Sequence, residues 1–147
     1  MYQKYFVVAA LLIGSNVTAL NADEKADSVN KFITEATALA KQGNFQQALN
    51  DMNQAIALDP SNAHAYNLRG NLYFAMENYT AALADLDRVV QLMPNVSGAY
   101  SDRAIVYYAM KNYQPALSDS DTALKLDPTN PVALAVRLKV FKELRAR

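Results

Sequence analysis

Apolar and polar positions alternate along most of the chain with the spacing of amphipathic helices. Aromatic and leucine side chains recur at intervals of three, four and seven residues, which places them on one face of a helix. Each helical stretch is about a dozen residues long and ends at a short polar turn, as at Gly43-Asn44, Glu77-Asn78 and Lys111-Asn112. The pattern predicts an all-α protein made of paired helices joined by tight turns.

The pattern repeats with a fixed period. Pro60, Pro94 and Pro128 are equally spaced, and each proline ends a predicted helix because the residue before it is disfavoured in the α region. A fixed period of this length is typical of repeat architectures, in which each unit completes the core of its neighbour. We therefore divide this part of the chain into three repeats: residues 29–62, 63–96 and 97–130.

Large and small residues follow one another in the same order within each repeat. The first helix carries a large, a small and a second large residue: Phe32, Ala36 and Leu39; Tyr66, Gly70 and Tyr73; Tyr100, Ala104 and Tyr107. The second helix carries a small, a bulky and a small one, with Ser120 as a departure at the bulky position: Ala48, Met52 and Ala55; Ala82, Leu86 and Val89; Ala116, Ser120 and Ala123. Small residues at these positions let two helices cross at interaxial distances of roughly 8–10 Å. The pattern resembles the tetratricopeptide repeat (TPR) family, and the resemblance implies a right-handed α-solenoid.

The segments that flank the repeats have different patterns. Residues 131–147 match the first helix of a fourth repeat, but Leu138 stands at its small position and its outer face is charged. We expect a capping helix of the kind that repeat arrays need for solubility. Residues 23–28 are expected to form a short linker before the first repeat.

Residues 1–22 have the composition of a secretory signal peptide. Lys4 is followed by an uninterrupted apolar run over residues 6–13 and then by small and polar residues, which is the order found in such leaders. The apolar run would extend only about 12 Å as a helix, which is too short for a hydrocarbon core of about 30 Å. Cleavage after Ala19 or Ala22 fits the preference for small residues. We therefore expect export, to the periplasm or outside the cell, with no stable membrane span after cleavage.

Two charged positions recur with the same period. The second helices carry Asp51, Asp85 and Asp119, and the first helices of the following repeats carry Arg69, Arg103 and Arg137. Pairing each aspartate with the arginine of the following repeat leaves none of them unmatched, so we predict ion pairs between successive repeats: Asp51–Arg69, Asp85–Arg103 and Asp119–Arg137. The alternative is a solvated helix face without pairing. The neighbouring acids, Asp85-Asp87 and Asp119-Asp121, point to different sides at this spacing, and we expect them to be solvated too.

The composition offers little that could carry out catalysis. The chain has 14 basic and 14 acidic residues and no cysteine, which excludes disulfides, thiolate metal sites and an overall field that attracts nucleic acid. His64 is the only histidine, and a zinc site would need further ligands. The sequence contains no glycine-rich phosphate loop and no Ser–His–Asp arrangement. We expect no enzyme activity, metal or cofactor, and a protein or peptide partner in place of nucleic acid.

The resemblance also implies a concave groove, lined by the first helices, that receives a peptide or helix. The groove positions that we expect to contact a partner are Thr37, Lys41, His64, Asn67, Asn71, Phe74, Ser101, Ile105, Tyr108, Lys139 and Lys142. The amides of Asn67 and Asn71 lie one helical turn apart and can bond a peptide backbone together. The rings of Phe74 and Tyr108 offer apolar contact area, or else pack between repeats.

One group of TPR proteins holds the C-terminal carboxylate of heat-shock chaperones with a clamp of lysine, asparagine and arginine. The matching positions of this chain hold Ile33, Thr37, Leu68, Gly98 and Asp102. The clamp is therefore absent, and the resemblance does not extend to that ligand.

These features favour an exported adaptor or scaffold that binds another protein. A small assembly factor of an envelope or pilus machine is the alternative in the same compartment. Self-association into a homo-oligomer is a structural alternative, because a short repeat array has two exposed ends. An enzyme would require a concave pocket with strongly shifted titratable groups.

Overall fold

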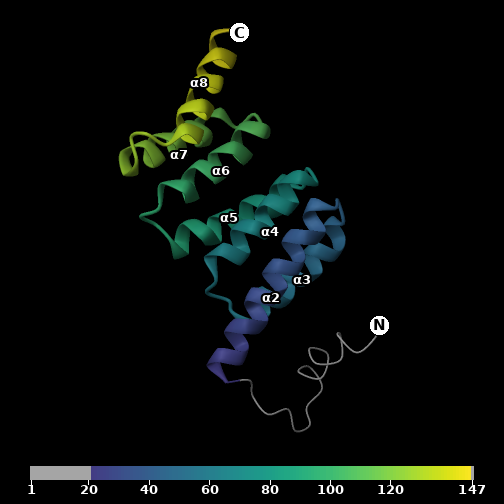
Figure 1. Ribbon diagram of the computed structural model, residues 1–147. Coiled ribbons are helices and arrows are strands. Elements are labelled where there is room, and N and C mark those ends of the chain that lie inside the picture. The colour runs from purple at the N-terminus through teal and green to yellow at the C-terminus, as the bar shows by residue number, and fades with distance from the viewer. Residues whose placement is uncertain (1–20, 147) are drawn as a thin grey trace.

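A computed structural model describes residues 21–146, which form seven helices and no strand in that range. The helices are α2 (Ala22–Lys41), α3 (Phe45–Leu58), α4 (Ala63–Ala75), α5 (Tyr79–Leu92), α6 (Ser97–Ala109), α7 (Tyr113–Leu126) and α8 (Pro131–Arg145). They stack as successive antiparallel pairs, from α2 and α3 at one end of the molecule to α8 at the other (Figure 1). The predicted all-α repeat solenoid is confirmed.

The turn inside each repeat has a residue with left-handed backbone conformation at the same repeat position. Gly43, Glu77 and Lys111 have φ of 78°, 58° and 59°. In the second repeat the next amide, of Asn78, donates to the carbonyl of Tyr73 at 2.8 Å, and equivalent bonds are present in the other two repeats. A left-handed residue followed by such a bond ends a helix within two residues. This turn brings the second helix of each repeat back along the first.

Small residues set the distance between the paired helices. A Cβ added to Gly70 would lie 3.3 Å from Leu86 Cγ and 3.4 Å from the Ala82 carbonyl oxygen. In the third repeat the same position holds Ala104, and the facing residue is the smaller Ser120. The pair Gly70 and Leu86 and the pair Ala104 and Ser120 are therefore matched in volume. In each pair a larger residue on one helix is offset by a smaller one on the other.

The first helix begins earlier than the sequence indicated. Residues 23–28, which we expected to be a linker, form the first turns of α2. Asn21 accepts a hydrogen bond from the Glu24 amide, and the Glu24 carboxylate accepts one from the Asn21 amide. This reciprocal pair satisfies two of the free amides of the helix start, so the expected linker is wrong. The predicted signal segment lies outside the described residues for all but its last two positions.

The last helix, α8, is attached to the third repeat through its cap as well as its packing. Asn130 Oδ1 accepts hydrogen bonds from the amides of Val132 and Ala133, and its Nδ2 donates to Ser97 Oγ at 2.8 Å. Val136 and Val140 are buried against the third repeat. Asn130 thus starts α8 and fixes the start to α6 with the same side chain. Within the described range, no helix is long and apolar enough to cross a membrane.

Candidate functional site

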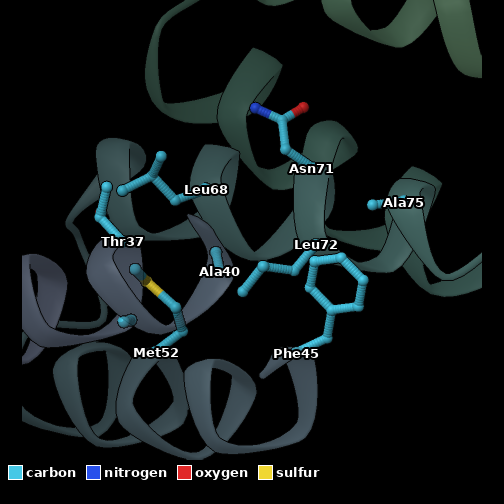
Figure 2. A pocket seen from close by; sticks show the side chains of 9 residues that line it. Thr37, Ala40, Phe45, Met52, Leu68, Asn71, Leu72 and Ala75 are labelled. Atoms are coloured by element: carbon cyan, nitrogen blue, oxygen red, sulfur yellow. The ribbon is translucent and has the colours of Figure 1, made fainter. Parts of the chain in front are cut away.

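A pocket of about 230 Å³ opens between the first and second repeats. Its walls come from α2, α3 and α4 and are mostly apolar: Ala36, Thr37, Ala40, Phe45, Met52, Leu68, Asn71, Leu72 and Ala75. Figure 2 shows Met52 and Phe45 rising from below, with Leu72 beside them and the amide of Asn71 at the rim, turned away from the apolar floor. The pocket can take an apolar side chain, with a polar group within reach at its edge.

A chain of hydrogen bonds orients the two groove amides. Asp102 Oδ2 accepts a hydrogen bond from Asn67 Nδ2 at 2.7 Å, and Asn67 Oδ1 accepts one from Asn71 Nδ2 at 3.2 Å. The carboxylate therefore fixes which way both amides point. Asn71 Oδ1 has no partner within residues 21–146, so it can accept a hydrogen bond from a ligand. Burial raises the pKa of Asp102, and the hydrogen bond from Asn67 offsets part of that rise.

The groove aromatics pack against the protein itself. The rings of Phe74 and Tyr79 are 5.6 Å apart, and those of Tyr108 and Tyr113 are 6.1 Å apart. Lys139 Nζ lies 5.8 Å from the centre of the Tyr108 ring, which links α8 to the groove side of α6. Phe74 and Tyr108 thus support the turns of their repeats, and only part of each ring is exposed to solvent.

The other predicted groove residues differ in accessibility. Lys41, His64 and Lys142 are exposed, whereas Thr37 and Ile105 are half-buried. Ser101 is only 2% exposed, donates to the Gly98 carbonyl oxygen and accepts a hydrogen bond from Asn130. Ser101 is therefore not accessible to a ligand in this structure, in contrast to the exposed groove positions. The sequence placed it by its repeat position and could not show that α8 covers it.

The pocket contains side chains that the sequence did not single out for binding. Met52 was predicted only as the bulky packing residue of the second helix of the first repeat, and Phe45 and Leu72 were given no role. In the structure they line the pocket together with side chains of α2 and α4. No periodicity distinguishes a core residue under an open pocket from one under a closed interface.

The recurring arginines and aspartates pair within repeats, contrary to the prediction. Arg69 Nε and Nη2 donate to the two carboxylate oxygens of Asp85 at 2.8 and 2.6 Å. Arg103 binds Asp119 in the same way, at 2.7 Å for both bonds. Asp85 and Asp119 are 4% and 6% exposed, so neither is the solvated acid that we expected. The predicted pairs failed because each arginine reaches the antiparallel helix of its own repeat, where the aspartate faces it.

Each arginine also reaches back to the preceding repeat. Nη1 of Arg69 donates to Asn53 Oδ1 at 2.7 Å, and Nη1 of Arg103 donates to Asp87 Oδ1 at 2.8 Å. Arg137 Nε lies 3.4 Å from Asp121 Oδ1, which is the corresponding contact. We call this series the arginine ladder: Arg69 and Arg103 with their acceptors before and after, and Arg137 with its acceptor before. The carboxylates raise the pKa of Arg103 above its ordinary value, so its charge is permanent.

The first repeat lacks an arginine at this position. Glu35 stands there, and it faces Asp51, the counterpart of Asp85. Burial and the nearby Glu35 carboxylate both raise the pKa of Asp51. The ladder therefore begins with two like charges at the N-terminal end of the array. Among the described residues, no group of three or more acids and histidines is placed to hold a metal ion.

Comparisons with known proteins agree with this geometry. Two family models described as tetratricopeptide repeat match residues 33–97 and 70–140, which together cover well over half of the chain. A paired-helix solenoid with this matched period defines a TPR protein. The chain belongs to the tetratricopeptide repeat family. A search of curated protein sequences finds no significant match.

Several solved structures share the fold. The first TPR domain of Spaghetti (RPAP3), bound to the HSP90 peptide SRMEEVD, is 24% identical with a TM-score of 0.76, over 81% of this chain and 94% of that one. The TPR domain of Arabidopsis OM64 is 22% identical with a TM-score of 0.75, over 81% and 98%. MamA is 20% identical with a TM-score of 0.72, over 78% and 67%. At these identities the similarity establishes the fold.

Proposed function

We propose that this protein is an adaptor that binds a peptide or helix of another protein in the groove lined by α2, α4 and α6. The apolar pocket between the first two repeats is the observation that carries the proposal. It would hold one large apolar side chain of the ligand, and burying such a side chain contributes roughly 1.5–3 kcal/mol. The proposed role is binding, not catalysis.

Asn71 gives the pocket a means to orient its ligand. Its free Oδ1 stands at the rim, where it can accept a hydrogen bond from a backbone amide next to the inserted side chain. Because Asp102 and Asn67 hold the amide in one orientation, little conformational entropy is lost when that bond forms. An extended peptide or the exposed end of a helix offers such an amide.

The peptides bound by related structures support a peptide ligand but not the same one. The first and second TPR domains of RPAP3 were solved with the HSP90 peptide SRMEEVD and the HSP70 peptide SGPTIEEVD. This chain has Asp102 in the groove and Leu68 beside the pocket, where the chaperone clamp has basic or amide side chains. An acidic peptide end would be repelled there. We therefore propose a ligand held by an apolar side chain in place of a terminal carboxylate.

Site-specific photo-crosslinking in the producing cell tests this function. A photoreactive phenylalanine analogue at Ala75, an exposed residue of the pocket wall, should crosslink to a discrete partner. The same analogue at Gln91, exposed on α5, should not. The crosslink to this partner should disappear when Ala40→Leu narrows the pocket. Its yield should fall severalfold in Asn71→Ala. Asn50→Ala, an exposed change on α3, is the matched control.

Two outcomes of this crosslinking experiment would contradict the proposal. A partner crosslinked equally from Ala75 and Gln91, or unaffected by Ala40→Leu in a variant with an unchanged circular dichroism spectrum, would place binding outside the groove.

We also propose that the protein is exported, with cleavage after Ala19. The capping box of α2 uses Asn21 and Glu24, and cleavage after Ala22 would remove the cap from the mature chain. Losing an N-cap costs about 1 kcal/mol, which favours the earlier of the two sites. Cell fractionation and mass spectrometry of the purified protein test this: a chain beginning at Met1, or one beginning at Asp23, would contradict it.

A further inference from the structure

The last helix leaves a row of apolar side chains uncovered. Leu134, Leu138, Phe141 and Leu144 are 47%, 56%, 45% and 41% exposed, and they make up half of the large exposed apolar residues of the described chain. Their spacing of four, three and three residues places them along one side of α8. We call these residues, together with Arg137, the α8 face. The buried side of the helix, through Val136 and Val140, is already packed on the third repeat.

The α8 face corresponds to the side of α6 that α7 covers. Leu134, Leu138 and Phe141 occupy the repeat positions that Tyr100, Ala104 and Tyr107 hold in the third repeat. In that repeat Ala104 is fully buried in a cluster with Ala116 of α7. The same helix side thus receives a second helix in the third repeat and, among residues 21–146, receives none on α8.

Arg137 has the start of the same arrangement but lacks its final partner. Its guanidinium carbon lies 5.7 Å from the centre of the Phe141 ring, just as Arg103 lies 5.9 Å from that of Tyr107. Arg103 then forms two bonds to Asp119 on α7, and its side chain is 19% exposed. Arg137 has no carboxylate on that side within residues 21–146, and its side chain is 45% exposed. The face therefore lacks both an apolar cover and an acid.

Charge argues against a second copy of this chain as the cover. The exposed side of α8 carries Arg137 and Arg145, whereas Glu143 is on a different side of the helix. Two α8 helices would therefore bring like charges together at an apolar contact. Residues 1–20 contain Lys4 and no acid.

We propose that the α8 face docks an amphipathic helix of another protein, which carries small residues along its contact side and a carboxylate that pairs with Arg137. This surface is separate from the groove of the proposed function. The carboxylate would accept two hydrogen bonds from the guanidinium, as Asp119 does from Arg103. The helix would run antiparallel to α8, in the orientation of α7 on α6.

The shape of the face restricts the partner further. Leu138 stands where Gly70 and Ala104 allow close helix contact in the other repeats. A docked helix must therefore place alanine, serine or glycine opposite Leu138. The sequence of α7 has this property, with Ala116, Ser120 and Ala123 on its packed side and Asp119 between them. A leucine in place of Ser120, as in α5, would collide with Leu138.

A peptide with the sequence of α7, residues 113–126, is the probe for this proposal. In this peptide Gln114→Lys and Ser118→Glu, both on the exposed side, supply the amine and carboxyl group of a lactam bridge. The bridge keeps the peptide helical, because a free peptide of this length is marginal in water. Fluorescence anisotropy with the purified protein should show saturable binding. Proton–nitrogen NMR spectra should place the shift changes on residues 134–145.

Variants of both partners isolate the carboxylate pair. Arg137→Glu in the protein, or asparagine in place of Asp119 in the peptide, should weaken binding roughly tenfold or more, since a charge-paired contact at an interface is worth at least about 1.4 kcal/mol. Lys125→Glu in the protein makes the same charge change at an exposed site on α7. This variant should bind the unchanged peptide as the parent does.

Three results would overturn the proposal. The first is no saturation up to about 1 mM peptide, a concentration that matches a free energy of about −4 kcal/mol. The second is binding that Arg137→Glu and Lys125→Glu affect equally, or shift changes confined to the groove. The third is a dimer in light scattering that Arg137→Glu dissolves, because the α8 face would then be covered by a second copy.

Discussion

Arg103 holds a buried carboxylate of its own repeat and an exposed one of the repeat before. Removing it would leave Asp119, 6% exposed, without a counter-charge in an apolar interface. Arg103→Met should therefore lower the free energy of unfolding by about 2–3 kcal/mol, somewhat less than for a fully buried pair because the arginine is partly exposed to water. Urea denaturation followed by circular dichroism measures this. Arg88→Met removes an arginine that, among residues 21–146, is bonded only to Gln91, and it should change stability by less than about 0.5 kcal/mol. Equal effects of the two variants would contradict the role of the ladder.

The acid pair at the start of the ladder predicts a stabilising substitution. Glu35→Arg would put beside Asp51 the residue that the second and third repeats have at this position. It should raise the free energy of unfolding by about 0.5–1 kcal/mol at neutral pH, whereas Glu143→Arg, the same change on α8, should not. A loss of stability in Glu35→Arg would show that the arginine cannot reach Asp51.

The gain should depend on pH in a defined direction. Burial and Glu35 raise the pKa of Asp51 above its ordinary 3.8, so the folded protein binds that proton more tightly than the unfolded chain does. The destabilisation that ionised Asp51 causes in the parent protein is therefore absent below about pH 3, and it grows as the pH rises through the raised pKa of Asp51. The difference between Glu35→Arg and the parent should be small at about pH 3 and largest near pH 7.

The ladder also marks the limit of prediction at the residue scale. The sequence revealed the recurring aspartates and arginines, but pairing each aspartate with the next repeat satisfied more of them than the correct pairing. The actual separation is 16 residues in both directions. Asn53, Asp87 and Asp121 also recur at one position of each repeat, and this second row of acceptors could have indicated the true arrangement.

At the scale of single helices, the sequence predicted most boundaries because prolines and polar turns mark them. The start of α2 is an exception, since the capping box of Asn21 and Glu24 coincides with the end of the predicted leader, whose pattern hides the helix start. The attachment of α8 was missed as well. It depends on the Asn130 side chain, which bonds Ser97 in a different helix, and no local pattern predicts such a contact.

Asn130→Ala should therefore cost more than the loss of an ordinary cap. It removes two bonds to the start of α8 and leaves Ser97 Oγ without its donor, for an expected loss of about 1–2 kcal/mol. Asn112→Ala is the matched control, because Asn112 precedes α7 without a side-chain cap bond. Hydrogen exchange should show faster opening of α8 in Asn130→Ala alone. Equal exchange of α8 in both variants would mean that packing, not the cap, holds the helix.

At the scale of the whole molecule, the stability of a repeat array is a sum of repeats and the interfaces between them. The second repeat, α4 and α5, has a neighbour on both sides, whereas α2 and α8 are at the ends (Figure 1). Native-state hydrogen exchange should therefore be slowest in α4 and α5 and fastest in α8. Equal protection along the chain would show that the array opens as one unit.

Matching properties of successive repeats predicted the fold of the molecule, but the candidate site depends on where they differ. The pocket exists beside Thr37 and Ala40 in the first repeat, and Ser101 is buried at the third because α8 covers it. A repeat alignment treats these positions as equivalent. Only the packing of each neighbour decides which of them a ligand can reach.

The arginine ladder has a consequence for how such a chain can change its length. Arg69 and Arg103 each bind one acceptor on the helix before and one on the helix after, and a single repeat unit reproduces both spacings. If residues 63–96 were duplicated in frame, the new arginine would find Asp87 behind it and its own copy of Asp85 ahead, and Arg103 would find the copied Asp87. Lengthening by internal duplication would thus leave no buried charge unpaired at the junction. The arginine ladder thus allows repeats to be added while each pair of neighbouring repeats keeps the same arginine contact.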